Sequence, residues 1–251
     1  MGFRLKLFGL HLLTSACVLA LVWGLFYFGW YRWPAWYLTG VLGVAAIMAG
    51  VDVVLGPSLT LIVANPNKTR RQLTRDIGVI AAVQLIAMAY GAVTLWHGRP
   101  LYYTYSERFL QIVQASDLDP REVELGRKLN PSLAPHWYSL PRWIYVPLPK
   151  DPKMRDQIVA SSITGGDDVI QMPRYYQPWQ NGLADLRSSL RVVSKMTELG
   201  LHDKERVGAR MRKLGLPTDQ PIALPMLGRG EPLVAIFDPA TLTLRALVRD
   251  D

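Results

Sequence analysis

The sequence is poor in cysteine. Among its 251 residues the one cysteine is Cys17, which lies within an apolar run. An internal disulfide and a metal site built on several cysteines are therefore excluded. The histidines are scattered at His11, His97, His136 and His202, without the close spacing that is typical of metal ligands. We expect neither a metal nor another cofactor.

Acidic residues are scarce in the first 97 positions. This part carries seven basic residues but only two acidic ones, Asp52 and Asp76, whereas positions 98–251 carry 21 basic and 18 acidic residues. Half of all residues are hydrophobic and only 19% are charged. The first part is typical of membrane helices with basic flanks, and the second of an ordinary soluble domain. Because the basic excess lies beside apolar runs, we expect membrane lipid as a partner and no nucleic acid.

Three apolar runs are long enough to cross a bilayer. We predict spans over about residues 7–29, 37–63 and 77–96, within a first domain of residues 1–97. The first run is too long for the core of a signal peptide, so we expect it to be retained. Six basic residues in the N-terminus and the 64–76 loop oppose the single Arg32 of the other loop. This asymmetry predicts a cytoplasmic N-terminus and a domain of residues 98–251 on the outside, which is the periplasm in a Gram-negative bacterium.

The second span contains a carboxyl group and a proline. Asp52 near the membrane centre costs about 2.5–3.5 kcal/mol on insertion scales. Pro57 leaves one helical carbonyl without its usual donor, and only a neighbouring helix can supply another. At about 1.5 Å per residue, Asp52, Gln84 and Ser15 lie roughly 16, 10 and 12 Å into their spans. The sequence therefore predicts that these three side chains meet in a small polar cluster.

The role of this cluster has two main interpretations. Asp52 can bond to Gln84 or to the freed carbonyl and so hold the bundle together. Alternatively, Ser15, Asp52, Gly56, Pro57 and Gln84 belong to a lateral groove that receives the helix of a partner. A proton or ion path is disfavoured, because three spans with one acidic residue offer little for a relay.

Residues 98–251 predict an α+β domain that is large enough for its own core. We expect strands over residues 101–113, 142–146, 222–227, 232–237 and 242–248, and helices over 152–163, 181–199 and 203–214, with a short helix after Asp119. The fold class is then a three-helix transmembrane bundle followed by an α+β domain.

Nothing in this domain has a pattern typical of catalysis. Gly165-Gly166-Asp167-Asp168 is better explained by a helix end and a polar turn than by a pair of catalytic acids. Arg229, between two glycines, lies in a segment too short to cradle a phosphate. Tyr175, Tyr176 and Trp179 form an aromatic cluster suited to a protein contact, although packing in the domain core explains it equally well. We expect no enzymatic activity and no small-molecule substrate.

Several segments of the first 115 residues together match a known pattern. They are Arg4–Leu13, Gly50–Val63, Asp76 with Gln84-Leu85 and Ala89-Tyr90-Gly91, and the exit Gly98-Arg99-Pro100 followed by Arg108-Phe109. Through them the chain resembles the type IV pilin accessory proteins, which are encoded beside pilin genes in Gram-negative bacteria. The resemblance implies an inner-membrane accessory protein or chaperone without enzymatic activity. Its partner would be the cognate pilin, met through its transmembrane helix and periplasmic head, and it would modulate pilus assembly, extension or retraction, and hence twitching motility.

Two other classes remain open. A membrane-anchored periplasmic sensor or binding module predicts a closed pocket within residues 101–251. A pilin-modifying envelope enzyme, which is less favoured, predicts titratable groups gathered around a cleft.

Overall fold

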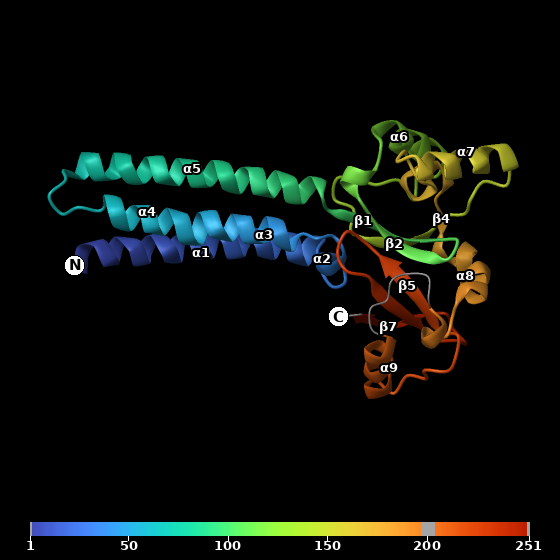
Figure 1. Ribbon diagram of the computed structural model, residues 1–251. Coiled ribbons are helices and arrows are strands. Elements are labelled where there is room, and N and C mark those ends of the chain that lie inside the picture. The colour runs from blue at the N-terminus through green and yellow to red at the C-terminus, as the bar shows by residue number, and fades with distance from the viewer. Residues whose placement is uncertain (1, 197–203, 250–251) are drawn as a thin grey trace. The chain divides into compact units, whose positions relative to one another are not determined.

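The computed structural model describes residues 2–196 and 204–249. These residues form two compact units, one helical and one mixed α/β (Figure 1). The helical unit includes the chain up to Arg32 and Val41–Gly98, whereas the second unit combines Trp33–Gly40 with the chain from Arg99 onward. The loop between the first two long helices therefore belongs to the second unit.

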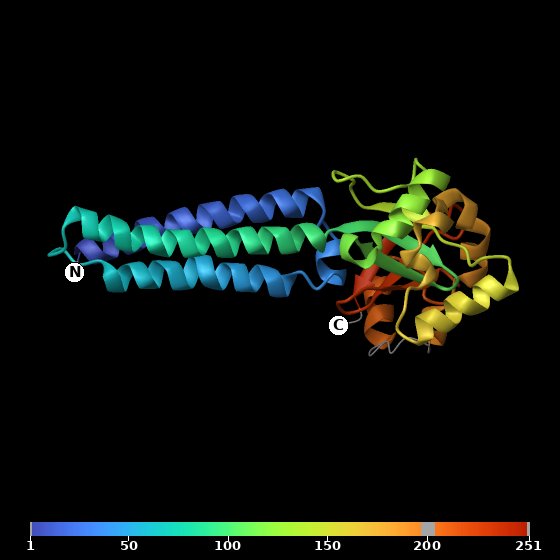
Figure 2. The same ribbon diagram turned by 90° about the horizontal axis from the view of Figure 1, so that it is seen from above.

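Three long helices lie side by side in the helical unit (Figures 1 and 2). They are α1 (Gly2–Gly29), a middle helix made of α3 (Leu42–Ala49), a π-helical turn (Gly50–Leu55) and α4 (Gly56–Val63), and α5 (Arg70–His97). Within the described part of the chain, these three are long and apolar enough to cross a membrane. The predicted three-helix bundle is confirmed as an arrangement of candidate spans, and this is the architecture of a multi-pass membrane protein.

Local sequence explains where the helices end. Thr69 and Gln72 form a capping box at the start of α5. Lys68 Nζ donates to the carbonyl of Val63 at 3.0 Å, at the end of α4, and pairs with Asp76 at 2.7 Å. Gly40 has a φ of +71°, a left-handed conformation that separates α2 (Ala35–Leu38) from the middle helix. The middle helix therefore begins at Leu42, whereas we predicted a span from residue 37.

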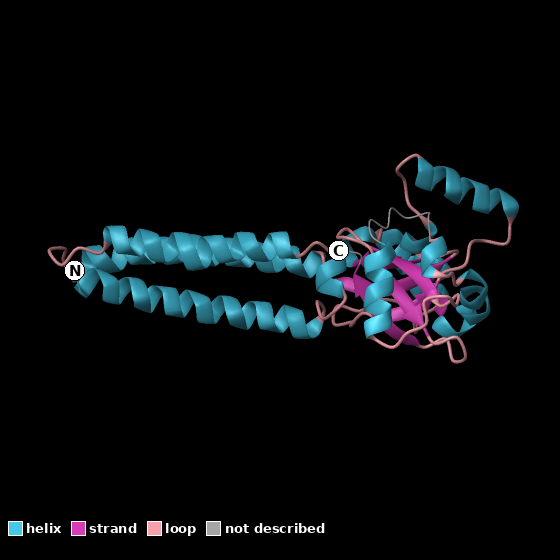
Figure 3. Ribbon diagram, turned by 60° about the horizontal axis from the view of Figure 1, so that its bottom comes forward, coloured by secondary structure: helices cyan, strands magenta, loops and turns pink. Residues whose placement is uncertain are grey.

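The second unit is built on one sheet (Figure 3), whose order is β4-β3-β1-β2-β5-β6-β7 in the described residues. Its strands are β1 (Pro100–Ser106), β2 (Phe109–Gln114), β3 (Arg142–Tyr145), β4 (Gln177–Pro178), β5 (Ala223–Leu227), β6 (Leu233–Phe237) and β7 (Leu244–Arg249). The helices are α6 (Pro120–Leu129), α7 (Pro152–Ile163), α8 (Leu183–Ser189) and α9 (Lys204–Lys213). The predicted α+β class is confirmed.

Both faces of the sheet are buried, as alternation along the strands shows. Tyr103 and Tyr105 of β1 pack in one cluster with Leu186 of α8 and Leu38 of α2. Tyr102, which directly precedes Tyr103 in β1, packs on the other face with Ile158 of α7. On β6, Val234 and Ile236 belong to a third cluster, which includes Val207 and Met211 of α9.

The docking of α2 explains two glycines that flank Arg229. The Gly230 amide donates to the Leu38 carbonyl at 2.9 Å, and a Cβ at Gly228 would overlap the same carbonyl oxygen. Arg229 between them pairs with Asp117 at 2.6 Å. The segment is therefore a backbone cradle for α2.

Two details of the sequence interpretation require correction. Residues 101–113 form two antiparallel strands, not one bent strand, and Glu107 at the turn has a φ of +53°. The helix predicted over residues 181–199 ends at Ser189, because Leu190 is extended and Arg191 bridges to Ala223. Part of that prediction, residues 197–199, and the start of the predicted 203–214 helix, residue 203, lie outside the described residues.

The cradle gives a first prediction. Gly228→Ala should destabilise the second unit by about 1–3 kcal/mol, because the new Cβ meets the rigid backbone of α2. Gly208→Ala is the control, since its Cβ would meet Arg212 Nη1 only at an ordinary 3.5 Å. Protease resistance of the full-length protein in detergent measures the difference, and equal resistance of both variants would contradict the cradle.

Candidate functional site

A polar cluster lies in the middle of the helical unit. The structure brings Ser15 of α1, Asp52 of the π-helical turn and Gln84 of α5 together, and all three side chains are buried. Gln84 Nε2 is 3.4 Å from Ser15 Oγ and 3.5 Å from Asp52 Oδ1. The depth comparison therefore placed these three residues correctly relative to one another.

The shortest bond of Gln84 to Asp52 is with the backbone. The Gly56 amide bonds to Val51 O, the i−5 acceptor, and so does not bond to Asp52 O. In a continued π-helix the next amide, that of residue 57, would serve Asp52 O, but Pro57 has no N–H. Gln84 Nε2 donates to this carbonyl at 3.0 Å. The side chain of α5 thus replaces a donor that the middle helix cannot supply.

His11 and Thr60 extend the network on the other side of Gln84. His11 Nε2 lies 2.7 Å from Gln84 Oε1, and His11 Nδ1 lies 2.5 Å from Thr60 Oγ1. Because Gln84 presents its carbonyl oxygen to the imidazole, a neutral His11 donates from Nε2 and accepts from Thr60 at Nδ1. One neutral tautomer therefore satisfies both contacts.

Gly56 lets Gln84 approach the middle helix. A Cβ at this position would overlap the terminal carbon, nitrogen and oxygen atoms of the Gln84 side chain. Asp52, Gly56 and Thr60 follow one another at intervals of four residues, so they share the face of the middle helix that meets Gln84. Pro57, beside them, is also buried. All of the residues predicted for this site, Ser15, Asp52, Gly56, Pro57 and Gln84, therefore lie in or beside one cluster.

A small cavity of about 160 Å³ opens beside the cluster. Its walls come from α1 and α5, with Asp52 of the middle helix between them; the lining residues are His11, Thr14, Ser15, Val18, Asp52, Ala81, Gln84, Leu85 and Met88. Val18 and Leu85 are exposed, so the rim of the cavity lies on the outer surface of the helical unit. This arrangement is a lateral pocket with a polar floor.

The aromatic residues predicted as contacts have three different environments. Tyr176 is fully buried, and its hydroxyl donates to Ile170 O at 2.6 Å. It is a core residue, so the expectation of a surface contact is wrong at this position. Tyr175 is half-buried beside Arg174 and lines a separate pocket of the second unit. Trp179 lines a third site, a cleft of the second unit.

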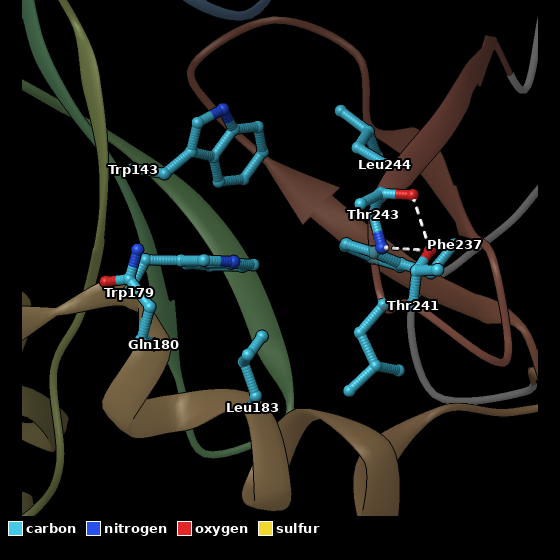
Figure 4. Close-up of a pocket in the computed structure, with 9 residues that line it drawn as sticks. Trp143, Trp179, Gln180, Leu183, Phe237, Thr241, Thr243 and Leu244 are labelled. Atoms are coloured by element: carbon cyan, nitrogen blue, oxygen red, sulfur yellow. Dashed lines mark hydrogen bonds between the residues drawn. The ribbon is translucent and has the colours of Figure 1, made fainter.

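This cleft has a volume of about 510 Å³ and mostly apolar walls. Figure 4 shows Trp143, Trp179 and Leu183 on one side and Phe237 and Leu244 on the other, with Thr241 and Thr243 bonded through their hydroxyls at 2.8 Å. The rings of Trp143 and Trp179 meet edge to face at 5.2 Å. The cleft is therefore suited to an apolar or aromatic group.

The tyrosines behind the cleft serve packing and hydrogen bonding. Burial raises the pKa of Tyr103 to about 12, and burial also raises the pKa of Tyr105, whose hydroxyl contacts Ser189 Oγ at 2.9 Å. Burial and the neighbouring Asp185 carboxylate raise the pKa of Tyr145. These three phenols therefore keep their protons at neutral pH.

Acidic residues of the second unit have structural positions. Asp168 begins a short 3₁₀ helix, Val169–Gln171, by accepting from the Val169 amide. This agrees with the interpretation of Gly165–Asp168 as a helix end and turn. No group of three or more His, Cys, Asp or Glu side chains within residues 2–196 and 204–249 is arranged to hold a metal ion.

Sequence reasoning missed four residues of these sites. His11 and Thr60 were available from spacing, since each lies one or two helical turns from a predicted member, Ser15 or Asp52. Trp143 and Phe237 reach the cleft from β3 and β6, which are not neighbours in the sheet. No local pattern predicts that meeting.

Gly56 generates a second prediction. Gly56→Ala should destabilise the bundle by about 1–3 kcal/mol, because its Cβ displaces Gln84 from the network. Gly43→Ala in the same helix has nothing within 4 Å of its Cβ and should be neutral or stabilising by up to about 1 kcal/mol. Detergent-titrated unfolding followed by tryptophan fluorescence distinguishes them. The close approach is wrong if Gly56→Ala is as stable as Gly43→Ala.

The backbone carbonyl of Asp52, which has no donor within its own helix, generates a third prediction. Gln84→Leu should cost about 1–3 kcal/mol of bundle stability, because Asp52 O then has no donor in hydrocarbon. Asp52→Leu should cost less, since Gln84 bonds mainly to the backbone at that position. The same unfolding titration measures both variants. Equal losses, or a greater loss for Asp52→Leu, would show that the carboxyl group is the stabilising partner.

Sequence comparison relates the chain to three curated proteins of Dichelobacter nodosus. The fimbrial assembly protein of serogroup I is 26% identical over 230 residues, which are 90% of this chain and 86% of that protein. The protein of serogroup E1 is 25% identical over the same coverage. The protein of serogroups C1 and C2 is 33% identical over 116 residues, which are 46% of this chain and 88% of that protein.

Comparisons with protein-family models and with solved structures gave no match. The curated relatives agree with the expected link to pilus assembly. With 33% identity to a protein of which it covers 88%, this chain belongs to the family of fimbrial assembly proteins.

Proposed function

We propose that the chain is an inner-membrane accessory protein, with a chaperone-like role, for the subunit of a type IV fimbria. The observation that carries the proposal is the relationship to fimbrial assembly proteins over 90% of the chain. The resemblance to pilin accessory proteins supplies the type of fimbria and implies a partner with an apolar helix and a globular head. The proposal includes no catalytic step.

The orientation is part of the proposal. Six basic residues in the N-terminus and the loop before α5 favour the cytoplasm, and Arg32 alone lies in the loop between the first two long helices. The second unit, which also contains that loop as α2, would then lie in the periplasm. The head of a fimbrial subunit would meet the second unit there, while its helix stays in the membrane beside the bundle.

The bundle offers α1 as its most open side. Among the described residues of α1, Ser15 alone is buried, whereas the middle helix and α5 each bury several residues. Apolar burial drives little association within lipid, so a helix contact depends on close packing and a few hydrogen bonds. Exposed apolar side chains such as Leu13, Leu21 and Leu25 supply packing surface on α1.

The cleft around Trp179 is the proposed contact for the head of the subunit. It is apolar and aromatic, and such pockets commonly anchor protein interfaces. Tyr175 remains a second candidate contact, whereas Tyr176 is withdrawn because it is buried.

A sensor or binding module is the second candidate function. The observation that favours it is the same cleft, whose volume of about 510 Å³ is within the usual range for a small-molecule site of roughly 300–1,000 Å³. Such a module would bind an apolar compound in the cleft, measured by quenching of tryptophan fluorescence, and would act independently of the fimbrial subunit.

Deletion and cross-linking test the proposed function and form our fourth prediction. Deleting the gene should reduce surface fimbriae and twitching while the subunit accumulates in the membrane, as seen by electron microscopy and immunoblotting. A photo-reactive phenylalanine analogue at Trp179 of the full-length protein should cross-link to the subunit. The same analogue at the exposed Leu214 is the control and should give no adduct.

The two candidate functions give opposite results. Normal fimbriation after deletion, together with no subunit adduct at Trp179 or Tyr175, would overturn the accessory role. Ligand-dependent quenching in that case would support the sensor.

A further inference from the structure

The lateral pocket of the bundle contains a polar atom without a partner. Asp52 is only 3% exposed, yet its Oδ2 makes no hydrogen bond to any of the described residues. Asp52 lies in the wall of the 160 Å³ cavity between α1 and α5. A buried carboxyl oxygen in a bilayer is costly unless a donor reaches it.

Neither Gln84 nor His11 supplies that donor. Gln84 Nε2 has two hydrogens, and its closest acceptors are Asp52 O at 3.0 Å and Ser15 Oγ at 3.4 Å, so its 3.5 Å contact with Asp52 Oδ1 is weak. The single N–H of a neutral His11 is used by Gln84 Oε1 at 2.7 Å. No group of the three helices bonds to Oδ2 in the structure, so a group from outside them has access to this oxygen as a donor.

The size and position of the cavity restrict what can enter. Its volume is several times the roughly 30 Å³ share of one water molecule, and well below the roughly 300 Å³ at which pockets for free ligands begin. Its rim is formed by Leu85, 65% exposed, and Val18, 40% exposed, on a surface that would face lipid. A single side chain of another helix has a size that fits this cavity and would reach it from the membrane.

We propose that the pocket receives one hydrogen-bond-donating side chain, with a hydroxyl, amide or amine group, from the transmembrane helix of the fimbrial subunit. Asp52 Oδ2 accepts the hydrogen bond, and the rim residues of α1 and α5 pack against the helix that carries the donor. This inference rests on the proposed function, since it names the group by which the accessory protein recognises its partner.

The geometry separates recognition from folding. The bundle depends on the bond from Gln84 to the Asp52 backbone carbonyl, which a substitution of the Asp52 side chain leaves in place. Asp52→Leu removes both side-chain oxygens at similar size, and Asp52→Asn keeps one acceptor oxygen. Recognition should therefore be lost in the first variant and largely kept in the second.

Site-specific photo-cross-linking in living cells tests the inference and is our fifth prediction. p-Benzoylphenylalanine replaces Leu85 at the rim or its neighbour Ile86, which is 71% exposed but does not line the pocket. The Leu85 position should yield an adduct with the fimbrial subunit, and the Ile86 position should not. Asp52→Leu should reduce the Leu85 adduct by about three- to tenfold, the effect of losing one hydrogen bond between membrane helices.

Each other outcome has a defined meaning. Adducts with lipid alone at Leu85, equal subunit adducts at Leu85 and Ile86, or an undiminished adduct in Asp52→Leu would overturn the inference. The Leu85 and Ile86 comparison needs no Asp52 variant, so it holds even if Asp52→Leu fails to fold. If gene deletion abolishes fimbriation while these experiments fail, the proposed function stands and only the pocket assignment is lost.

Discussion

One hydrogen bond, from Gln84 Nε2 to the carbonyl of Asp52, is the interaction on which the helical unit depends. The π-helical turn sends the Gly56 amide to Val51, and Pro57 has no amide hydrogen, so the middle helix cannot serve that carbonyl itself. In hydrocarbon no water replaces the missing donor. The donor from α5 requires a glycine at position 56, and the far end of Gln84 then orients His11 and Thr60.

The second unit is stabilised mainly by apolar packing, because its sheet is buried on both faces. Segments from distant parts of the chain supply the cover, including α2, which lies between the first two long helices in sequence. The Gly228-Arg229-Gly230 segment accepts the backbone of α2 at two glycines. The loop between the first two long helices therefore contributes Leu38 to the core of this unit.

Local patterns of hydropathy predicted the three long helices and the α+β class. The meeting of Ser15, Asp52 and Gln84 was predicted from the depth of each residue along its span. The same approach missed His11, although its spacing from Ser15 was informative. It placed Tyr176 at a contact surface because an aromatic cluster looks alike in a core and in an interface. It extended the 181–199 helix through Leu190, where pairing with the sheet overrides the apolar pattern. The cleft of Trp143, Trp179 and Phe237 depends on tertiary pairing, which no short segment encodes.

Asp52 has two separate roles in this account. Its backbone carbonyl accepts the hydrogen bond that closes the bundle, and its carboxyl oxygen in the lateral pocket is available to the helix of a fimbrial subunit. The most direct test of this separation is solid-state NMR of the protein in lipid bilayers, with ¹⁵N in the Gln84 side chain and ¹³C in the Asp52 carbonyl. The account predicts a through-space cross-peak between Gln84 Nε2 and the Asp52 backbone carbonyl carbon that persists in Asp52→Asn, observed there at the carbonyl of the substituted residue. A cross-peak only to the side-chain carboxyl carbon, or loss of the backbone cross-peak in Asp52→Asn, would contradict it.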